Sequence, residues 1–370
     1  MDFIDLDEQE LSSFSSFPQQ YPITPDLQLK SLKASSSLDS LSSDSSTSST
    51  STALFIRSAS LDEEMINFNN VETPRIDGFE FSIILPDSTA PARLIFNYKG
   101  PHHEGRDSQV FRGTLYNDES SINSAPVAVA VKVYRDDQSA QEGAQKEIEI
   151  AYLTTGRPDF LKFYYSGQLA LSDNVRFVTV WEWIDAGTLD RSLSKLTDDA
   201  LFKTIFSIAK SLNHLHINHI AHHDLKPQNI LITMDRVIMI DFGDSKKLNS
   251  DTNLLPIDEG IGFGTLAYTA PELLSKKSSD YSPFAADVYS FGVLLFYLLN
   301  HGKILPFASL IPHRAVQLIL TVQKGFFAGG YNPESPAQSP LFPLMNQCLQ
   351  VDPKLRPTFP QLIEIINEQM

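Results

Sequence analysis

The sequence has little cysteine, few basic residues and no long apolar run. Its single cysteine, Cys348, excludes an intramolecular disulfide and is typical of a protein kept in a reducing compartment. The longest apolar run, residues 293–299, is far shorter than the roughly 18–20 residues of a membrane-spanning helix. Only 29 Lys and Arg residues oppose 45 Asp and Glu residues, and the net charge of −16 disfavours binding to nucleic acid or to an anionic membrane.

The N-terminal region differs in composition from the rest of the chain. Residues 1–75 carry 12 acidic and 4 basic residues, and 17 of the 30 residues in 31–60 are Ser or Thr. Such a segment cannot bury enough apolar surface to offset the entropy lost on ordering, so we predict that it is disordered. It is a candidate site for an upstream kinase or a regulatory partner, although a solvated linker is the simpler interpretation.

The first ten residues are acidic, unlike the basic start of a secretory signal or a transit peptide. We therefore expect an intracellular protein, chiefly cytoplasmic, with a nuclear location left open.

The remaining residues, 76–370, change from a strand-rich to a helix-rich pattern. Alternating or β-branched stretches predict five strands, at residues 79–85, 92–98, 127–133, 160–165 and 175–181. Apolar residues then recur with a period near 3.6 over residues 200–217, which predicts a helix. A second helix, opened by Asp287, is apolar on nearly every side and must therefore be buried.

Two short polar loops carry most of the candidate chemistry. Asp224 and Asn229 lie in residues 221–229, between an apolar helix and an apolar strand, and Asp241 follows the next strand directly. Loops at the mouths of neighbouring strands can aim their side chains at one point. Phosphoryl transfer needs such a set, with an acceptor for the proton of the attacking hydroxyl and oxygen ligands for Mg²⁺.

These loops resemble those of eukaryotic-type protein kinases. Residues 221–229 are similar to the catalytic loop, with His223 where the family usually has Arg, and residues 241–243 are similar to the metal-binding loop. Further landmarks follow in the family's order: the end of the activation segment at 264–272, and residues 352–357. The latter supply Arg356, which in the family pairs with the carboxylate at Glu272.

The resemblance implies an α+β, two-lobed protein-kinase fold. The small lobe, residues 76–184, would hold five strands and one helix, and the larger lobe, residues 185–370, would be mainly helical. The residues around Lys226 resemble those of the Ser/Thr branch, so the implied activity is transfer of the γ-phosphoryl of ATP to a protein hydroxyl. The implied cofactors are ATP and Mg²⁺, and the implied partner is a protein substrate.

The resemblance also implies roles for individual residues. Asp224 would be the catalytic base, Lys226 would neutralise the transferred group, and Asn229 and Asp241 would bind Mg²⁺. Lys132, inside a β-branched strand, would hold the α- and β-phosphates and pair with a glutamate on the following helix. Glu147 is the favoured partner, and Glu149 remains the rival. The implied ATP-binding residues are Gly105, Val110, Ala130, Lys132, Glu147, Glu182 and Leu231.

The sequence departs from the family most clearly at the glycine-rich loop. Counting back from Val110, the three glycine positions hold His103, Gly105 and Ser108, so only the middle glycine is present. This departure leaves open a pseudokinase, a binding or scaffold module on the same fold. A small-molecule phosphotransferase of kinase-like fold is a second alternative, but such a protein should lack the Ala-Pro-Glu sequence that this chain has at residues 270–272.

Trp181 is predicted to stand at the back wall of the ATP site. If Glu182 is the first residue of the linker between the lobes, Trp181 guards the pocket behind the adenine and shares a strand face with Thr179. The alternative is a register shifted by one residue, with Trp181 in the core of the small lobe.

Overall fold

The computed structural model describes residues 79–85, 90–116, 125–171, 174–248, 253–257, 266–274, 279–302 and 339–369. All of them belong to one unit of the chain. The predicted disorder of residues 1–75 lies outside the described residues, as do residues 264 and 265 of the activation segment.

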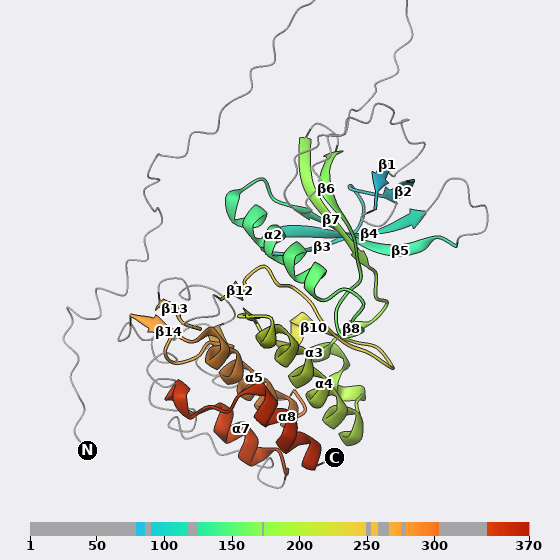
Figure 1. Cartoon of the computed structure of the whole chain (residues 1–370). Helices are drawn as coiled ribbons and strands as arrows, with labels where there is room; N and C mark the ends of the chain where they lie inside the picture. The colour runs from blue at the N-terminus through green and yellow to red at the C-terminus, as the bar shows by residue number, and fades with distance from the viewer. Residues whose placement is uncertain are drawn as a thin grey trace, which may run out of the picture. The chain divides into compact units, whose positions relative to one another are not determined.

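The N-terminal part of the described chain is an antiparallel sheet in the order β1-β2-β4-β5-β7-β6, with β3 paired to β4 (Figure 1). Side chains of β5 alternate, so that Val129, Val131 and Val133 enter the core while Lys132 lies on the opposite face. The strands are β1 (Phe79–Ile84), β2 (Pro91–Phe96), β3 (His102–Glu104), β4 (Ser108–Tyr116), β5 (Val127–Tyr134), β6 (Phe163–Leu171) and β7 (Asn174–Glu182).

This sheet has seven strands, so the expected number of five was wrong. Two strands, β2 and β3, both pair with β4, because a turn at residues 97–101 divides the chain between them. The two strands that the prediction missed are β3 and β4. Strands β1 and β2, which pair at the sheet edge, were both predicted. The strand expected at 160–165 begins only at Phe163 and continues to Leu171, while Phe160 makes an isolated bridge to Met239.

One helix, α2 (Gln138–Leu153), packs against the sheet (Figure 1). It begins where the Asp137 carboxylate accepts a hydrogen bond from the Ala140 N–H, a standard N-cap. Its buried side includes Ala140, Ala144 and Glu147, which face β5 and β7. A glutamate on this side is therefore directed at the strand that carries Lys132.

The C-terminal part is mainly helical, as predicted, and α4 and α5 cover the stretches expected to be helices. Helix α5 is buried nearly all round, because Phe291, Leu294 and Phe296 point in different directions and all lie in the core. The helices are α3 (Leu189–Ser192), α4 (Asp198–Ile217), α5 (Pro283–Leu299), α7 (Phe342–Cys348) and α8 (Phe359–Glu368). Among the described residues, no helix has the length and apolar character needed to span a bilayer.

Short strands next to these helices carry the two polar loops. In one three-stranded sheet, β10 pairs with both β8 and β11, and in another sheet β9 pairs with β12. The catalytic-loop residues lie between β9 and β10, and Asp241 follows β11 closely, so pairing of β10 with β11 brings both loops together. The short strands are β8 (Gly187–Thr188), β9 (Ile220–Ala221), β10 (Ile230–Ile232), β11 (Val237–Met239), β12 (Lys246–Lys247), β13 (Leu255–Pro256) and β14 (Asp280–Tyr281).

The predicted pair of Arg356 and Glu272 is present in the helical part. Both guanidinium NH2 groups donate to the Glu272 carboxylate at 2.7 Å, and Arg356 also donates to the carbonyl oxygens of Gln350 and Ala285. A buried guanidinium needs this many acceptors, because an unpaired buried charge is strongly destabilising. The fold thus has the expected two-part arrangement, β-rich at its N-terminal side and helical at its C-terminal side.

Candidate active site

A carboxylate from the core of the helical part holds the catalytic loop. Asp287 on α5 accepts hydrogen bonds from the backbone N–H groups of His222 and His223, at 2.7 and 2.8 Å. The ring Nε2 of His216 lies 2.9 Å from the same carboxylate. Burial alone would raise the pKa of Asp287, but these hydrogen bonds and the neighbouring imidazoles hold it below its ordinary value.

His223, at the position where the family has Arg, is an uncharged group in this site. Its backbone is left-handed, with φ of 65°, and its ring Nε2 lies 2.9 Å from the Tyr281 hydroxyl. Burial lowers the pKa of His223 to about 4, so the ring is neutral near pH 7. A neutral ring cannot supply the charged, bidentate grip on a phosphate that a guanidinium supplies.

Asp224 is buried, and its carboxylate is held by the two neighbours that the sequence singled out. Lys226 Nζ lies 2.5 Å from Asp224 Oδ2. The side-chain amide of Asn229 donates to the same oxygen at 2.9 Å and to the backbone carbonyl of Asp224 at 2.8 Å. These contacts fix the orientation of the Asp224 carboxylate, which lies in the loop that precedes β10.

Asp241 enters the site through an unusual backbone conformation. Its φ is 66°, a left-handed value that is costly for a residue with a side chain and is concentrated at functional sites. The next residue, Phe242, is buried against Phe160 and His222, with ring centroids 5.9 and 5.2 Å away. Asp241 Oδ1 lies 3.7 Å from Lys132 Nζ. Burial raises the pKa of Asp241, but the charge of Lys132, together with His222, Lys226 and Arg106, more than offsets this and holds it below its ordinary value.

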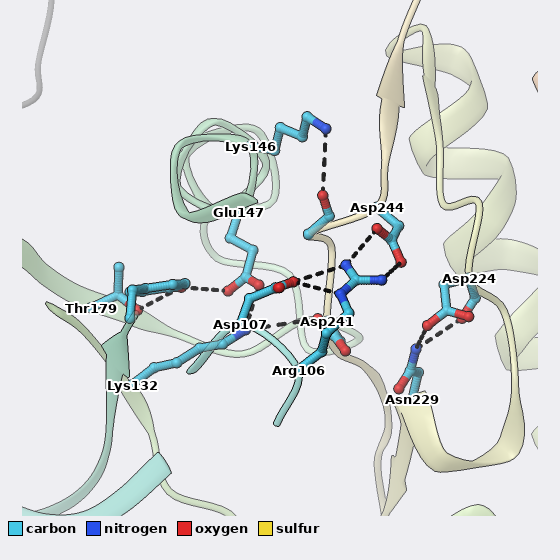
Figure 2. A network of polar contacts seen from close by, with 12 residues as sticks. Arg106, Asp107, Lys132, Lys146, Glu147, Thr179, Asp224, Asn229, Asp241 and Asp244 are labelled. Carbon is cyan, nitrogen blue, oxygen red and sulfur yellow. Dashed lines mark hydrogen bonds and ion pairs between the residues drawn. The ribbon is translucent and has the colours of Figure 1, made fainter. Parts of the chain in front are cut away.

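Of the two candidate partners for Lys132, the structure places Glu147 against it. Their ammonium and carboxylate groups are in direct contact, as Figure 2 shows, whereas Glu149 lies 3.3 Å from Lys247 at the surface. Burial opposes charge on both partners. Burial therefore raises the pKa of Glu147, and although burial lowers that of Lys132, the adjacent Glu147 carboxylate raises it above its ordinary value.

The loop that replaces the glycine-rich loop is a tight turn between β3 and β4. The N–H of Gly105 donates to the carbonyl oxygen of Ser108 at 2.8 Å, within the turn. The Arg106 side chain makes a bidentate contact with Asp244, at 2.7 and 3.1 Å, and also contacts Asp107 (Figure 2). This pair was not predicted, because its members are 138 positions apart and no local pattern connects them.

A cleft of about 700 Å³ contains every residue that the sequence analysis placed in the site. The cleft lies between the small sheet with α2 and the short strands β8, β10 and β11. Its lining includes Asp224, Lys226, Asn229, Asp241, Gly105, Val110, Ala130, Lys132, Glu147, Glu182 and Leu231.

Glu182 lines the cleft but its carboxylate is used elsewhere. It forms two contacts with the guanidinium of Arg236, at 2.7 and 3.1 Å, and so ties the end of β7 to the turn between β10 and β11. Trp181, next to it, also lines the cleft and is 8% exposed. Its ring packs edge-on against Phe163 and its Nε1 donates to Thr179 Oγ1 at 2.7 Å.

The donor set fits a Mg²⁺ ion that shares its ligands with phosphates. Among the described residues, no group of three His, Cys, Asp or Glu side chains is placed to hold a metal by itself. The amide nitrogen of Asn229 is turned to Asp224, which leaves its carbonyl oxygen as the atom suited to a metal. Asp241 lines the same cleft and supplies a carboxylate. One or two protein oxygens completed by phosphate oxygens and water are what Mg²⁺ commonly uses.

The two-part fold and this cleft agree with the resemblance to protein kinases, and comparison with known proteins supports it. A family model described as protein kinase domain matches residues 104–365, so the chain belongs to the protein kinase family. The family assignment supports protein kinase activity.

Three relatives illustrate the similarity. The chain is 28% identical over 271 residues to serine/threonine-protein kinase STY17 of Arabidopsis thaliana, covering 71% of this chain and 43% of the relative. It is 31% identical over 301 residues to 3-phosphoinositide-dependent protein kinase B of Dictyostelium discoideum, covering 80% and 31%. It is 35% identical over 194 residues to human receptor-interacting serine/threonine-protein kinase 4, covering 49% and 22%. The alignments span less than half the length of each of these relatives.

Proposed function

We propose that the chain is a catalytically active kinase that transfers the γ-phosphoryl of ATP to serine or threonine hydroxyls of a protein. The observation that carries this proposal is the convergence of Lys132, Asp224, Asn229 and Asp241 on one cleft. Lys132, Asn229 and Asp241 could serve nucleotide binding alone, but a positioned base at Asp224 has a use only in the transfer step.

Asp224 is the group that accepts the proton of the attacking hydroxyl. Its carboxylate is held by Lys226 and Asn229, so it is oriented before the substrate arrives. The hydroxyl oxygen attacks the γ-phosphorus, the bond to the β,γ-bridging oxygen breaks, and ADP leaves with the bond's electrons. The Lys226 ammonium, beside the base, balances negative charge on the transferred group.

Lys132 would bind the phosphates of the nucleotide, and Asn229 and Asp241 would bind its metal ion. Lys132, oriented by Glu147, is available to the α- and β-phosphates at the floor of the cleft. Asn229 and Asp241 would hold Mg²⁺, which when bound neutralises phosphate charge and orients the triphosphate.

The domain boundaries belong to the same proposal. We assign residues 76–370 to the kinase domain, with the division between lobes after residue 184, and residues 1–75 to an acidic region open to a regulatory partner. The described strands begin at Phe79, and β7 ends at Glu182, in keeping with both boundaries.

A pseudokinase is the competing function, because the loop over the phosphates lacks two of its three glycines. The Gly105 N–H is used inside the turn and Arg106 spans the mouth of the cleft. Both features change how nucleotide is held, but neither removes the base or the metal ligands.

The test is phosphoryl transfer from Mg-ATP to a mixed peptide library that contains Ser, Thr and Tyr acceptors. The wild-type protein should phosphorylate Ser and Thr peptides, and Asp224→Asn should abolish most of this activity while still binding Mg-ATP. Asp241→Ala should instead lose Mg-ATP binding. Equal activity in wild type and Asp224→Asn would refute the assignment of the base, and binding of Mg-ATP without any transfer would favour the pseudokinase.

A further inference from the structure

Four side chains of the small sheet meet beneath α2. Lys132 and Tyr134 are two residues apart on β5, and Thr179 and Trp181 are two residues apart on β7, so each pair shares a face of its strand. The register sets Lys132 opposite Thr179, which puts both pairs on the same face of the sheet. Glu147 on α2 points to this face.

Tyr134 contacts the carboxylate that orients Lys132. Its hydroxyl donates to Glu147 Oε2 at 2.9 Å, while Lys132 contacts Oε1 of the same carboxylate. Both Tyr134 and Glu147 are buried, with exposed fractions of 2% and 5%. In such surroundings a carboxylate oxygen that lost its donor would be costly, because no water replaces the lost bond.

These hydrogen bonds form an array that runs from Trp181 at the back wall of the cleft, through Thr179 and Tyr134, to Glu147. Each side chain donates to the next one along the array. The Trp181 indole can only donate, and its Nε1–H points at Thr179 Oγ1, 2.7 Å away. The Tyr134 proton is used on the Glu147 carboxylate, which can only accept. The 3.2 Å contact between Thr179 and Tyr134 must therefore be donated by the Thr179 hydroxyl. Figure 2 shows Thr179 and Glu147 at the two ends of the dashed lines, with Lys132 below both.

We propose that Tyr134 and Thr179 are positioning residues for ATP, which fix the Glu147 carboxylate and with it α2 and Lys132. The proposal rests on the proposed kinase function for its catalytic readout. A phenylalanine at position 134 would fill nearly the same space, so the proposal assigns the effect to the hydroxyl rather than to packing.

The array also couples the back wall to the phosphate-binding lysine. A change at Trp181 would alter the donor that orients Thr179, and this change would pass to Tyr134 and Glu147. Side chains of β5 and β7 would thus help to hold α2 in its ATP-binding arrangement from within the small sheet.

The test compares Tyr134→Phe with Tyr289→Phe. Tyr289 on α5 is a matched control, because it is equally buried and its hydroxyl has no hydrogen-bond partner among the residues that the structure describes. Thr179→Val is a second variant, which keeps the side-chain volume and removes the donor to Tyr134. Three quantities are measured for each: amide hydrogen exchange across Gln138–Leu153, the Kd for Mg-ATP, and kcat and KM for phosphoryl transfer.

Tyr134→Phe should raise exchange in α2 and weaken Mg-ATP binding, with kcat/KM for ATP lower by about 10- to 100-fold, the range for a hydrogen bond to a charged group. Thr179→Val should change the same quantities in the same direction by a smaller factor, and Tyr289→Phe should change none of them.

Unchanged α2 exchange in a folded Tyr134→Phe protein would overturn the proposal, and so would unchanged Mg-ATP affinity. If Tyr134→Phe does not fold, Thr179→Val decides by the same two readouts. The exchange comparison requires no catalysis, so absence of phosphoryl transfer in the wild type would refute the proposed function without affecting this test.

Discussion

The ion pair between Arg106 and Asp244 is expected to slow the exchange of nucleotide. It connects the turn over the phosphate end of the cleft to the residue that follows the metal-binding loop, so the turn must separate from Asp244 to open fully. Removing the pair by Arg106→Ala should therefore speed both entry and release of ATP and ADP.

The magnitude follows from the exposure of the two partners. The Arg106 side chain is 59% exposed and that of Asp244 is 7% exposed, so the pair lies between a surface pair and a buried one. Surface pairs contribute about 0.2–1 kcal/mol, whereas breaking a buried pair costs about 3–5 kcal/mol. We expect about 1–2 kcal/mol for this partly screened, bidentate pair, which corresponds to release faster by about 5- to 30-fold.

The assay is stopped-flow displacement of a fluorescent ADP analogue by excess ATP. A cycle of Arg106→Ala, Asp244→Asn and the double variant isolates the pair, because the double variant should release nucleotide no faster than the single ones. Arg93→Ala is the control, since Arg93 pairs with Glu80 at the far edge of the sheet. Release rates equal to wild type in both single variants, or additive effects in the double variant, would refute the reasoning.

Of four further predictions, one concerns the base, two the catalytic-loop histidine, and one the back wall. Asp224→Asn should lower phosphoryl transfer by about 10² to 10⁴, the contribution of a positioned general base, as measured by initial rates with saturating Mg-ATP. Because His223 is neutral, activity should not require a phosphate on the activation segment. A variant with three hydroxyl residues of this segment changed to alanine should keep its kinase activity, and loss of most activity would contradict the prediction. The three positions are Ser245 and, outside the described residues, Ser250 and Thr252. The pKa of His223 is about 4 in the folded protein, below its ordinary value of about 6.5. Between these two pH values the unfolded chain binds the proton and the folded protein does not, so the free energy of unfolding decreases as pH falls towards 4. Urea unfolding should show a smaller loss over this range for His223→Gln; equal losses would exclude His223 as the cause. Trp181→Gly should admit ATP analogues with bulky N6 groups, at a cost of about 3–5 kcal/mol in unfolding free energy; a folded variant that uses ATP but rejects every such analogue would place Trp181 in the core instead.

The sequence by itself determined the fold class and the chemistry of the two loops. Asp224, Asn229 and Asp241 occur in short segments whose spacing along the chain is set by two paired strands, so their convergence could be predicted locally. Locally, Lys132 stands out only as a cation within a β-branched strand, and its place in the cleft was predicted through the family resemblance. The pair of Arg356 and Glu272 was also predicted, though only through the family resemblance.

The choice between Glu147 and Glu149 could be made only from the tertiary structure. Two residues apart on a helix, these side chains point in nearly opposite directions, so the phase of α2 decides which one meets Lys132. That phase is fixed by the Asp137 cap and by burial of Ala140 and Ala144 against the sheet.

The contacts between side chains of different elements were likewise decided by the tertiary structure. Alternation along a strand indicates that Lys132 and Tyr134 share a face, but the strand that pairs with β5 and its register determine that Thr179 joins them. Arg106 and Asp244 meet only because two parts of the chain, 138 positions apart, fold onto the same cleft. Local sequence patterns encode which face a side chain occupies, whereas partners across the fold depend on packing between elements, which no local pattern specifies.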